Sequence, residues 1–276
     1  MLPLKDNVPT ARFPLVTVIL IALNLAAFAW QLSLPSDRAS SPELARAGVS
    51  ERDQASIEYG AIPYRITHPG SECGVTSAEI VCGDEGAVEV GSRKKGSAIP
   101  EDVDAPPWWL TLITSMFLHG GLLHFGGNML FLWIFGNTVE GAMGRMRFAL
   151  FYLSAGLIAL YAQAALAPDS TGPIIGASGA VAGVLGGYAL LHPRAKVLGL
   201  VLVPFFVTLV EIPALLLIAL WFALQFVPAI GPLATPEVAE GGIAYLAHVA
   251  GFLFGLAAIR LFARRRERPE APIPVY

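Results

Sequence analysis

The sequence predicts an all-α protein that is embedded in a lipid bilayer and crosses it with six helices. Hydrophobic residues make up 55% of its 276 residues and only 14% are charged, whereas about 25% of a typical soluble domain is charged. Its mean hydropathy is +0.61, and its apolar residues gather in runs close to the roughly 20 residues that a spanning helix needs. The net charge of −3 gives no reason to expect nucleic acid as a partner.

A short cytoplasmic tail, residues 1–12, precedes the first predicted span at residues 13–34. This span lacks a small-residue cleavage site of the usual kind after Trp30, so we interpret it as a membrane anchor and not a signal peptide. The other spans fall within a core over residues 108–263, where the Trp108–Trp109 pair predicts an aromatic anchor at the interface. We expect them at about 117–139, 148–167, 174–191, 211–227 and 243–262.

The fifth apolar stretch, Val197 to Val227, is interrupted by Pro204, Glu211 and Pro213. We therefore expect Val197–Val210 to lie near the interface and the spanning helix to begin at Glu211.

Basic residues follow the second, fourth and sixth predicted spans, and residues 264–276 form a basic tail. Lys and Arg concentrate in cytoplasmic loops, so the sequence predicts that both termini are cytoplasmic. The long loop at residues 35–107 is then extracytoplasmic, since long loops translocate largely regardless of charge. We expect a multi-pass protein of the cell membrane.

The extracytoplasmic loop holds both cysteines, Cys73 and Cys82. An exported loop is an oxidising setting that favours a disulfide between them, with a pair of free thiols as the alternative. A zinc site that combined these cysteines with His68 would lack an obvious fourth ligand, so we expect no metal.

Ser178 and His248 lie inside predicted spans, where a polar group is costly to bury unless it is paired. They are of the residue types that make a nucleophile and its base. Both fall near the outer ends of their spans, and small residues around them would let the two helices approach closely. The alternatives are a serine bonded to a carbonyl of its own helix and a histidine with a structural or pore-lining role.

His124 and Asn128 are four residues apart in the second span, so they share one helical face in the outer half of the membrane. Polar donors aimed at one point are what an oxyanion site requires. The alternative is that they only link helices. His119, nearer the surface, is expected to be structural.

The predicted spans carry no Asp or Glu in their outer halves and no Lys near Ser178. A Ser178–His248 dyad is therefore the simplest arrangement, in place of a Ser-His-Asp triad or a Ser-Lys pair. The chain also lacks His-Glu-x-x-His, so a zinc protease of that type is unsupported. We expect no cofactor.

Four motifs occur in order along the chain: residues 119–128 (HGGLLHFGGN), Glu140 with Gly144–Arg145, residues 176–179 (GASG) and residues 247–251 (AHVAG). With them the chain resembles the rhomboid intramembrane serine proteases from about Phe13 to Phe262. The resemblance implies a six-helix bundle, Ser178 as nucleophile, His248 as base, and an oxyanion site built from Asn128, His124 and the Ser178 backbone N–H. The expected supporting residues are His119, Gly176, Gly179, Gly251, Gly255, Glu140 and Arg145.

The chain departs from the family at two places. Some rhomboids carry an aromatic residue four positions after the serine, stacked on the histidine, where this chain has Ala182. The first loop also lacks the Trp-Arg pair of well-known members.

The resemblance implies transmembrane proteins as substrates and a site that opens to the extracytoplasmic side. The alternatives are a catalytically silent, rhomboid-like chaperone or adaptor and a small transporter or channel. The transporter would need buried charge or inverted repeats, and neither is visible. The sequence carries no signal for an oligomeric state.

Overall fold

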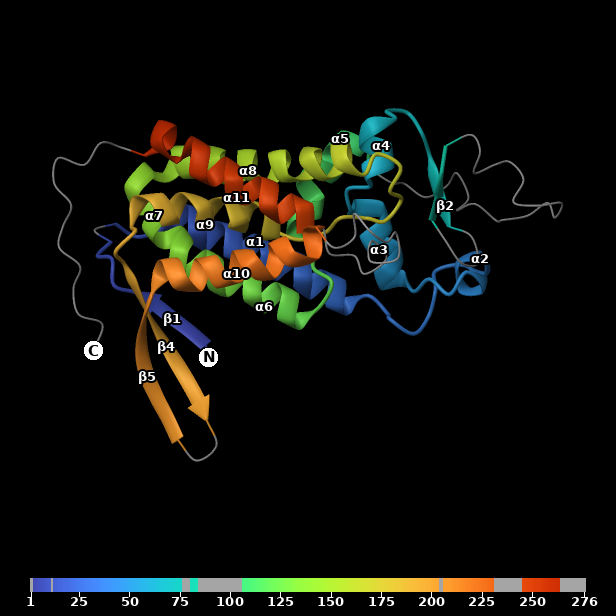
Figure 1. Cartoon of the computed structure of the whole chain (residues 1–276). Helices are drawn as coiled ribbons and strands as arrows, with labels where there is room; N and C mark the ends of the chain where they lie inside the picture. Colours follow the sequence, from blue (N-terminus) through green and yellow to red (C-terminus); the bar gives the residue numbers. More distant parts are fainter. Residues whose placement is uncertain are drawn as a thin grey trace.

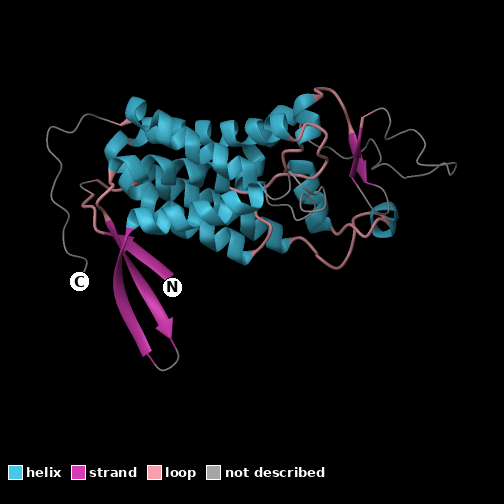
Figure 2. Ribbon diagram, in the orientation of Figure 1, coloured by secondary structure: helices cyan, strands magenta, loops and turns pink. Residues whose placement is uncertain are grey.

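A computed structural model of the chain describes residues 2–10, 12–75, 80–83, 106–203, 206–230 and 245–263. Most of the structure is a bundle of helices, with a small β-sheet at one end and a mixed region at the other (Figures 1 and 2). The helices of the bundle are α1 (Leu15–Ser33), α6 (Leu122–Phe131), α7 (Asn137–Met143), α8 (Arg145–Leu166), α9 (Ser178–Leu191), α10 (Ala214–Ile230) and α11 (Tyr245–Phe262).

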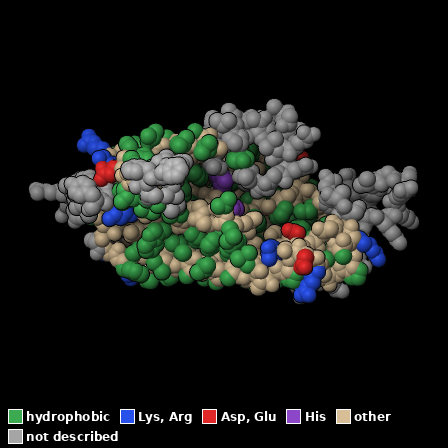
Figure 3. Space-filling model, turned by 90° about the horizontal axis from the view of Figure 1, so that it is seen from below, with side chains coloured by type: hydrophobic (Ala, Val, Ile, Leu, Met, Phe, Trp, Pro, Cys, Tyr) green, Lys and Arg blue, Asp and Glu red, His purple; other side chains and the backbone are tan. Residues whose placement is uncertain are grey.

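The bundle is built for a membrane environment. Within the described residues, α1, α8 and α11 are long and apolar enough to cross a bilayer. Large apolar side chains remain exposed on the outside of the helices, including Leu23, Leu150, Leu220 and Leu253. Figure 3 shows such side chains spread over one face of the bundle. Hydrocarbon is the solvent that makes this exposure favourable.

Helix α9 lies at the centre of the bundle, and every residue from Ala180 to Ala189 is buried. It packs against α8 and α11 and also touches α6, α7 and α10. A short helix can occupy this position because protein, and not lipid, surrounds it. A polar residue at its end is therefore shielded from hydrocarbon.

The second predicted span is not one continuous helix. Helix α5 (Trp108–Thr114) and a 3₁₀ turn (Ser115–Phe117) end ahead of Gly120–Gly121, and α6 begins only at Leu122. A π-helical turn at Leu132–Gly136 then joins α6 to α7. The predicted start near residue 117 was too early, because the glycine pair breaks the helix just before the residues of the candidate site.

The all-α prediction was incomplete, because five short strands occur in the described residues. Strands β1 (Leu2–Asp6), β4 (Lys196–Val203) and β5 (Phe206–Pro213) form an antiparallel sheet in the order β1-β4-β5.

The run Val197–Val210, which we expected near the interface, lies within the β4–β5 hairpin. Glu211 to Pro213 end β5, so the helix begins at Ala214 and not at Glu211. Runs of β-branched residues on both sides of Pro204 fit a hairpin better than a helix.

The region between α1 and α5 is folded and lies at the opposite end of the bundle from the β1-β4-β5 sheet (Figure 1). It contains α2 (Pro42–Arg46), α3 (Glu51–Tyr59), α4 (Pro63–Thr67) and a hairpin of β2 (Cys73–Val75) and β3 (Ile80–Cys82). A disulfide joins Cys73 to Cys82 across the hairpin. Residues 76–79 and 84–105 of the predicted loop, residues 231–244 and the predicted tail 264–276 lie outside the described residues.

Candidate active site

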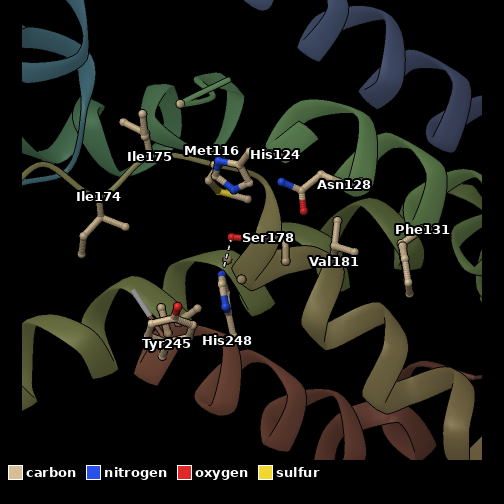
Figure 4. A pocket seen from close by; sticks show the side chains of 18 of the residues that line it. Met116, His124, Asn128, Phe131, Ile174, Ile175, Ser178, Val181, Tyr245 and His248 are labelled. Atoms are coloured by element: carbon tan, nitrogen blue, oxygen red, sulfur yellow. Dashed lines mark hydrogen bonds between the residues drawn. The ribbon is translucent and has the colours of Figure 1, made fainter. Parts of the chain in front are cut away.

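Ser178 and His248 meet at the end of the bundle nearest the region between α1 and α5. Ser178 is the first residue of α9, and His248 lies in the first turn of α11. The Ser178 Oγ and His248 Nε2 atoms are 2.6 Å apart, within hydrogen-bond distance (Figure 4). The two residues are 70 positions apart in the sequence, so the contact depends on how α9 and α11 pack.

Glycines let α9 and α11 approach until their backbones touch. A Cβ atom at Gly251 would lie 2.2 Å from the carbonyl oxygen of Gly179, and one at Gly255 would lie 2.0 Å from that of Gly183. Real Cβ atoms do not approach backbone this closely. The predicted small-residue faces are therefore the surfaces through which these helices contact each other, as is common in membrane bundles.

The loop before Ser178 passes close to His124. Gly176 has a φ of +125°, a conformation that L side chains rarely adopt. A Cβ atom there would lie 2.8 Å from His124 Cε1 and 3.5 Å from Ser178 Oγ. Glycine thus keeps open the space between the serine hydroxyl and the imidazole of His124.

Asn128 lies one turn beyond His124 on α6, and Figure 4 shows both side chains on the same side of Ser178. The Nδ2 atom of Asn128 is buried and has no hydrogen-bond partner among the described residues. The backbone N–H of Ser178 belongs to the first turn of α9, where N–H groups have no partner within the helix. These donors border the same space, as an oxyanion site requires.

The four polar residues open into one cavity of about 660 Å³. Histidine is visible in a hollow of the surface in Figure 3. Apart from Ser178, His124, Asn128 and His248, most of the lining is apolar or glycine, including Met116, Phe131, Ile174, Val181, Trp221 and Leu224. The cavity can therefore hold an apolar polypeptide segment next to a few directed polar groups.

Two aromatic rings of other positions flank His248, where some rhomboids have an aromatic residue in place of Ala182. The ring centroid of Trp221, on α10, is 6.1 Å from that of His248, and the Tyr245 ring lies edge-on at 6.4 Å. Ala182 itself is fully buried. Sequence reasoning missed Trp221, because a tryptophan in an apolar run carries no motif.

His119 lies behind the cavity and does not line it. It is buried, and its ring packs edge-on against the rings of Phe28, His124 and Phe125. Its backbone N–H donates to the Gln31 side-chain oxygen at 2.8 Å. Gln31 was also missed, although a glutamine within an apolar span is itself a signal of a buried polar contact.

Glu140 and Arg145 lie outside the cavity. The buried Glu140 carboxylate accepts hydrogen bonds from the backbone N–H groups of Val16 and Thr17 at 3.0 and 2.8 Å, and from the Thr17 hydroxyl at 2.8 Å. It therefore caps the N-terminus of α1. Arg145 begins α8 and is exposed, and no ion pair joins it to Glu140 in the described part of the chain.

No group of three or more His, Cys, Asp or Glu side chains among the described residues could hold a metal ion.

The fold and this cavity define a membrane protein with a serine–histidine pair among its helices, in which the histidine is buried and the serine is partly buried. The family model of the Rhomboid domain matches residues 106–265, and the chain belongs to the rhomboid family, as the sequence motifs predict.

Three curated relatives give the range of similarity. The chain is 36% identical to presenilin-associated rhomboid-like protein A, mitochondrial, of Danio rerio over 34% of its own length and 25% of the relative's. It is 37% identical to rhomboid protein 1, mitochondrial, of Saccharomyces cerevisiae over 32% and 27%. It is 44% identical to rhomboid protease GluP of Bacillus subtilis over 31% and 16%. The matched segment thus spans about a quarter or less of these relatives.

Proposed function

We propose that this protein is an intramembrane serine endopeptidase that uses a Ser178–His248 dyad. The observation that carries the proposal is the 2.6 Å separation of Ser178 Oγ and His248 Nε2 inside a cavity. A hydroxyl at this distance from an imidazole is the arrangement that activates a serine nucleophile. One relative in the same family, GluP, is named a protease.

The reaction begins when His248 Nε2 accepts the proton of the Ser178 hydroxyl. The Oγ atom attacks the carbonyl carbon of the scissile peptide, forming a C–O bond and a tetrahedral oxyanion. His248 then gives the proton to the leaving amine as the C–N bond breaks. A water molecule, deprotonated by His248, hydrolyses the resulting acyl-enzyme and restores the serine.

The oxyanion would form beside donors that are already in place. We assign to it the Asn128 Nδ2 atom, which has no partner among the described residues, the Ser178 backbone N–H and the His124 ring. The Ser178 N–H also lies at the positive end of the α9 dipole. Fixed donors of this kind stabilise the transition state without reorganisation.

Among the described residues that line the cavity there is no Asp or Glu. Trp221 and Tyr245 flank the imidazole, and we infer that they limit its rotation.

We infer that the substrates are transmembrane proteins and that the cavity opens to the extracytoplasmic side of the cell membrane. The basic residues Arg147, Arg194 and Arg260 lie at or beyond the helix ends away from Ser178, which the positive-inside rule assigns to the cytoplasm. A transmembrane substrate must unwind locally, because hydrogen bonds and packing shield the peptide bonds of a helix.

The proposal is tested with purified full-length protein and a model transmembrane substrate. Ser178→Ala and His248→Ala should each abolish cleavage, whereas Ser154→Ala, a serine on α8 outside the cavity, should cleave at the wild-type rate. Cleavage that survives in Ser178→Ala would contradict the proposal. A wild type that binds membrane proteins but cleaves none would favour a catalytically silent adaptor.

A further inference from the structure

The loop that leads into Ser178 is paired with the region between α1 and α5. Ala61 forms two backbone hydrogen bonds with Ile174, from Ala61 N to Ile174 O at 3.0 Å and from Ile174 N to Ala61 O at 2.8 Å. Tyr64 N donates to Ser170 O at 3.0 Å in the same loop. Figure 1 shows α3 and α4 beside the chain that enters α9.

The two segments also fit sterically. Ala61 is completely buried. A Cβ atom at Gly60 would meet the Ser56 carbonyl oxygen of α3 first, and would lie 2.8 Å from the Pro173 side chain and 3.1 Å from that of Ile175. Gly172, in the same loop, has no atom within 4 Å of the corresponding position and is exposed. The loop therefore leaves no room for a Cβ atom at Gly60, whereas a Cβ atom at Gly172 would touch nothing.

A further hydrogen bond, to the end of α5, holds the loop from the other side. Gly176 N donates to Ser115 O at 2.8 Å, at the end of α5. Thr114, the neighbour of Ser115, donates its hydroxyl to Tyr59 O at 2.7 Å. Residues 174–176 are thus held between Ala61 and Ser115, and Ser178 follows two residues later.

The paired region is itself attached to the bundle. The Arg52 guanidinium, on α3, donates to the carbonyl oxygens of Gln31, Leu32 and Leu34 at 3.0, 3.2 and 2.9 Å. These carbonyls lie at the C-terminal end of α1, where a cation is favourable. The Gln31 oxygen also accepts a hydrogen bond from the Leu34 backbone N–H at 3.2 Å. The Ala61–Ile174 contact therefore joins the loop that precedes Ser178 to a region that is itself bonded to the end of α1.

We propose that Gly60–Ile62 is a positioning segment for the nucleophile. Its pairing with Ile174 sets the path of Gly176 and Ala177, and hence the direction of the Ser178 Oγ and N–H groups toward His248 and the oxyanion site. This inference rests on the proposed protease activity. It assigns to the region between α1 and α5 a role in catalysis, although none of its described residues lines the cavity.

The test uses full-length Ala61→Pro, which removes the N–H that donates to Ile174, with Ala61→Gly as the control that keeps it. Labelling of Ser178 by a fluorophosphonate and kcat for a transmembrane substrate should both fall, by up to about 100-fold for a displacement near 1 Å. KM should stay within about twofold of wild type, because the apolar cavity lining is unchanged. Ala61→Gly should keep most of both rates.

Gly60→Ala, matched by Gly172→Ala, supplies an independent test if Ala61→Pro does not fold. Gly60→Ala should lower the labelling rate and kcat together, and Gly172→Ala should lower neither. A folded Ala61→Pro or Gly60→Ala that labels at the wild-type rate would overturn the positioning role while leaving the protease proposal intact. A wild type that neither labels nor cleaves would instead refute the protease proposal itself.

Discussion

Substitution of Gly251 by Ala probes the contact between α9 and α11 on which the dyad depends. The new Cβ atom would lie 2.2 Å from the carbonyl oxygen of Gly179, and contacts below 3.0 Å do not occur in real structures. Backbone cannot rotate away as a flexible side chain can. The helices must therefore separate, so that this distance rises from 2.2 Å to at least 3.0 Å, an increase of about 0.8 Å that should cost about 1–3 kcal/mol of stability.

The same separation acts on the dyad, because Gly251 lies one turn after His248 and Gly179 directly follows Ser178. An increase of 0.8 Å would lengthen the 2.6 Å Oγ–Nε2 distance beyond good hydrogen-bond geometry. We expect the turnover rate to fall by about 10- to 100-fold.

The assay compares fluorophosphonate labelling, substrate cleavage and thermal unfolding of Gly251→Ala with those of Gly126→Ala. Gly126 is an exposed glycine of α6 with open space around it, so its alanine variant should keep the wild-type rates and melting temperature. Wild-type labelling by Gly251→Ala would mean that the close approach of the two backbones does not set the geometry of the dyad, and would contradict this prediction.

Three further predictions concern residues away from the cavity. Glu140→Gln should lower the stability by about 1–2 kcal/mol, because an amide replaces the carboxylate that caps α1. In thermal unfolding, a melting temperature equal to that of the wild type would contradict the capping role. Burial raises the pKa of Asp6 above its ordinary 3.8, so the folded state binds the proton more tightly, and the stability from that proton is lost as the pH rises through the raised pKa. Unfolding measured at several pH values should therefore show that Asp6→Asn gains stability relative to wild type above pH 3.8. A stability difference between the two proteins that stays constant or shrinks as the pH rises would be inconsistent with this burial. Replacing both Cys73 and Cys82 by Ser removes the disulfide and should destabilise the region between α1 and α5 by about 2–3 kcal/mol. Limited proteolysis of that region measures the change, and unchanged protection from the protease would argue against a stabilising disulfide.

The membrane character and the family could be predicted from the sequence because both are carried by local patterns. Apolar runs of the right length reveal the membrane environment, and the motifs around Asn128, Ser178 and His248 lie within short stretches of chain. The small-residue spacing of Gly251 and Gly255 also indicated where helices could meet.

The contacts that orient the site could not be predicted, because they join distant segments. Trp221 beside His248, Gln31 beside His119 and Ala61 beside Ile174 each depend on the packed bundle. The β4–β5 hairpin was missed for another reason. A short apolar run can form either a strand or a membrane-associated helix, and neither its composition nor its periodicity separates the two.

The role of Ser178 and His248 is tested most directly by identifying the residue that a fluorophosphonate modifies in the purified full-length protein. Peptide mapping by mass spectrometry should place the adduct on Ser178 in the wild type and find none in Ser178→Ala. The rate of adduct formation should fall by at least about 100-fold in His248→Ala, which lacks the base. An adduct on another serine, or undiminished labelling without His248, would contradict the dyad.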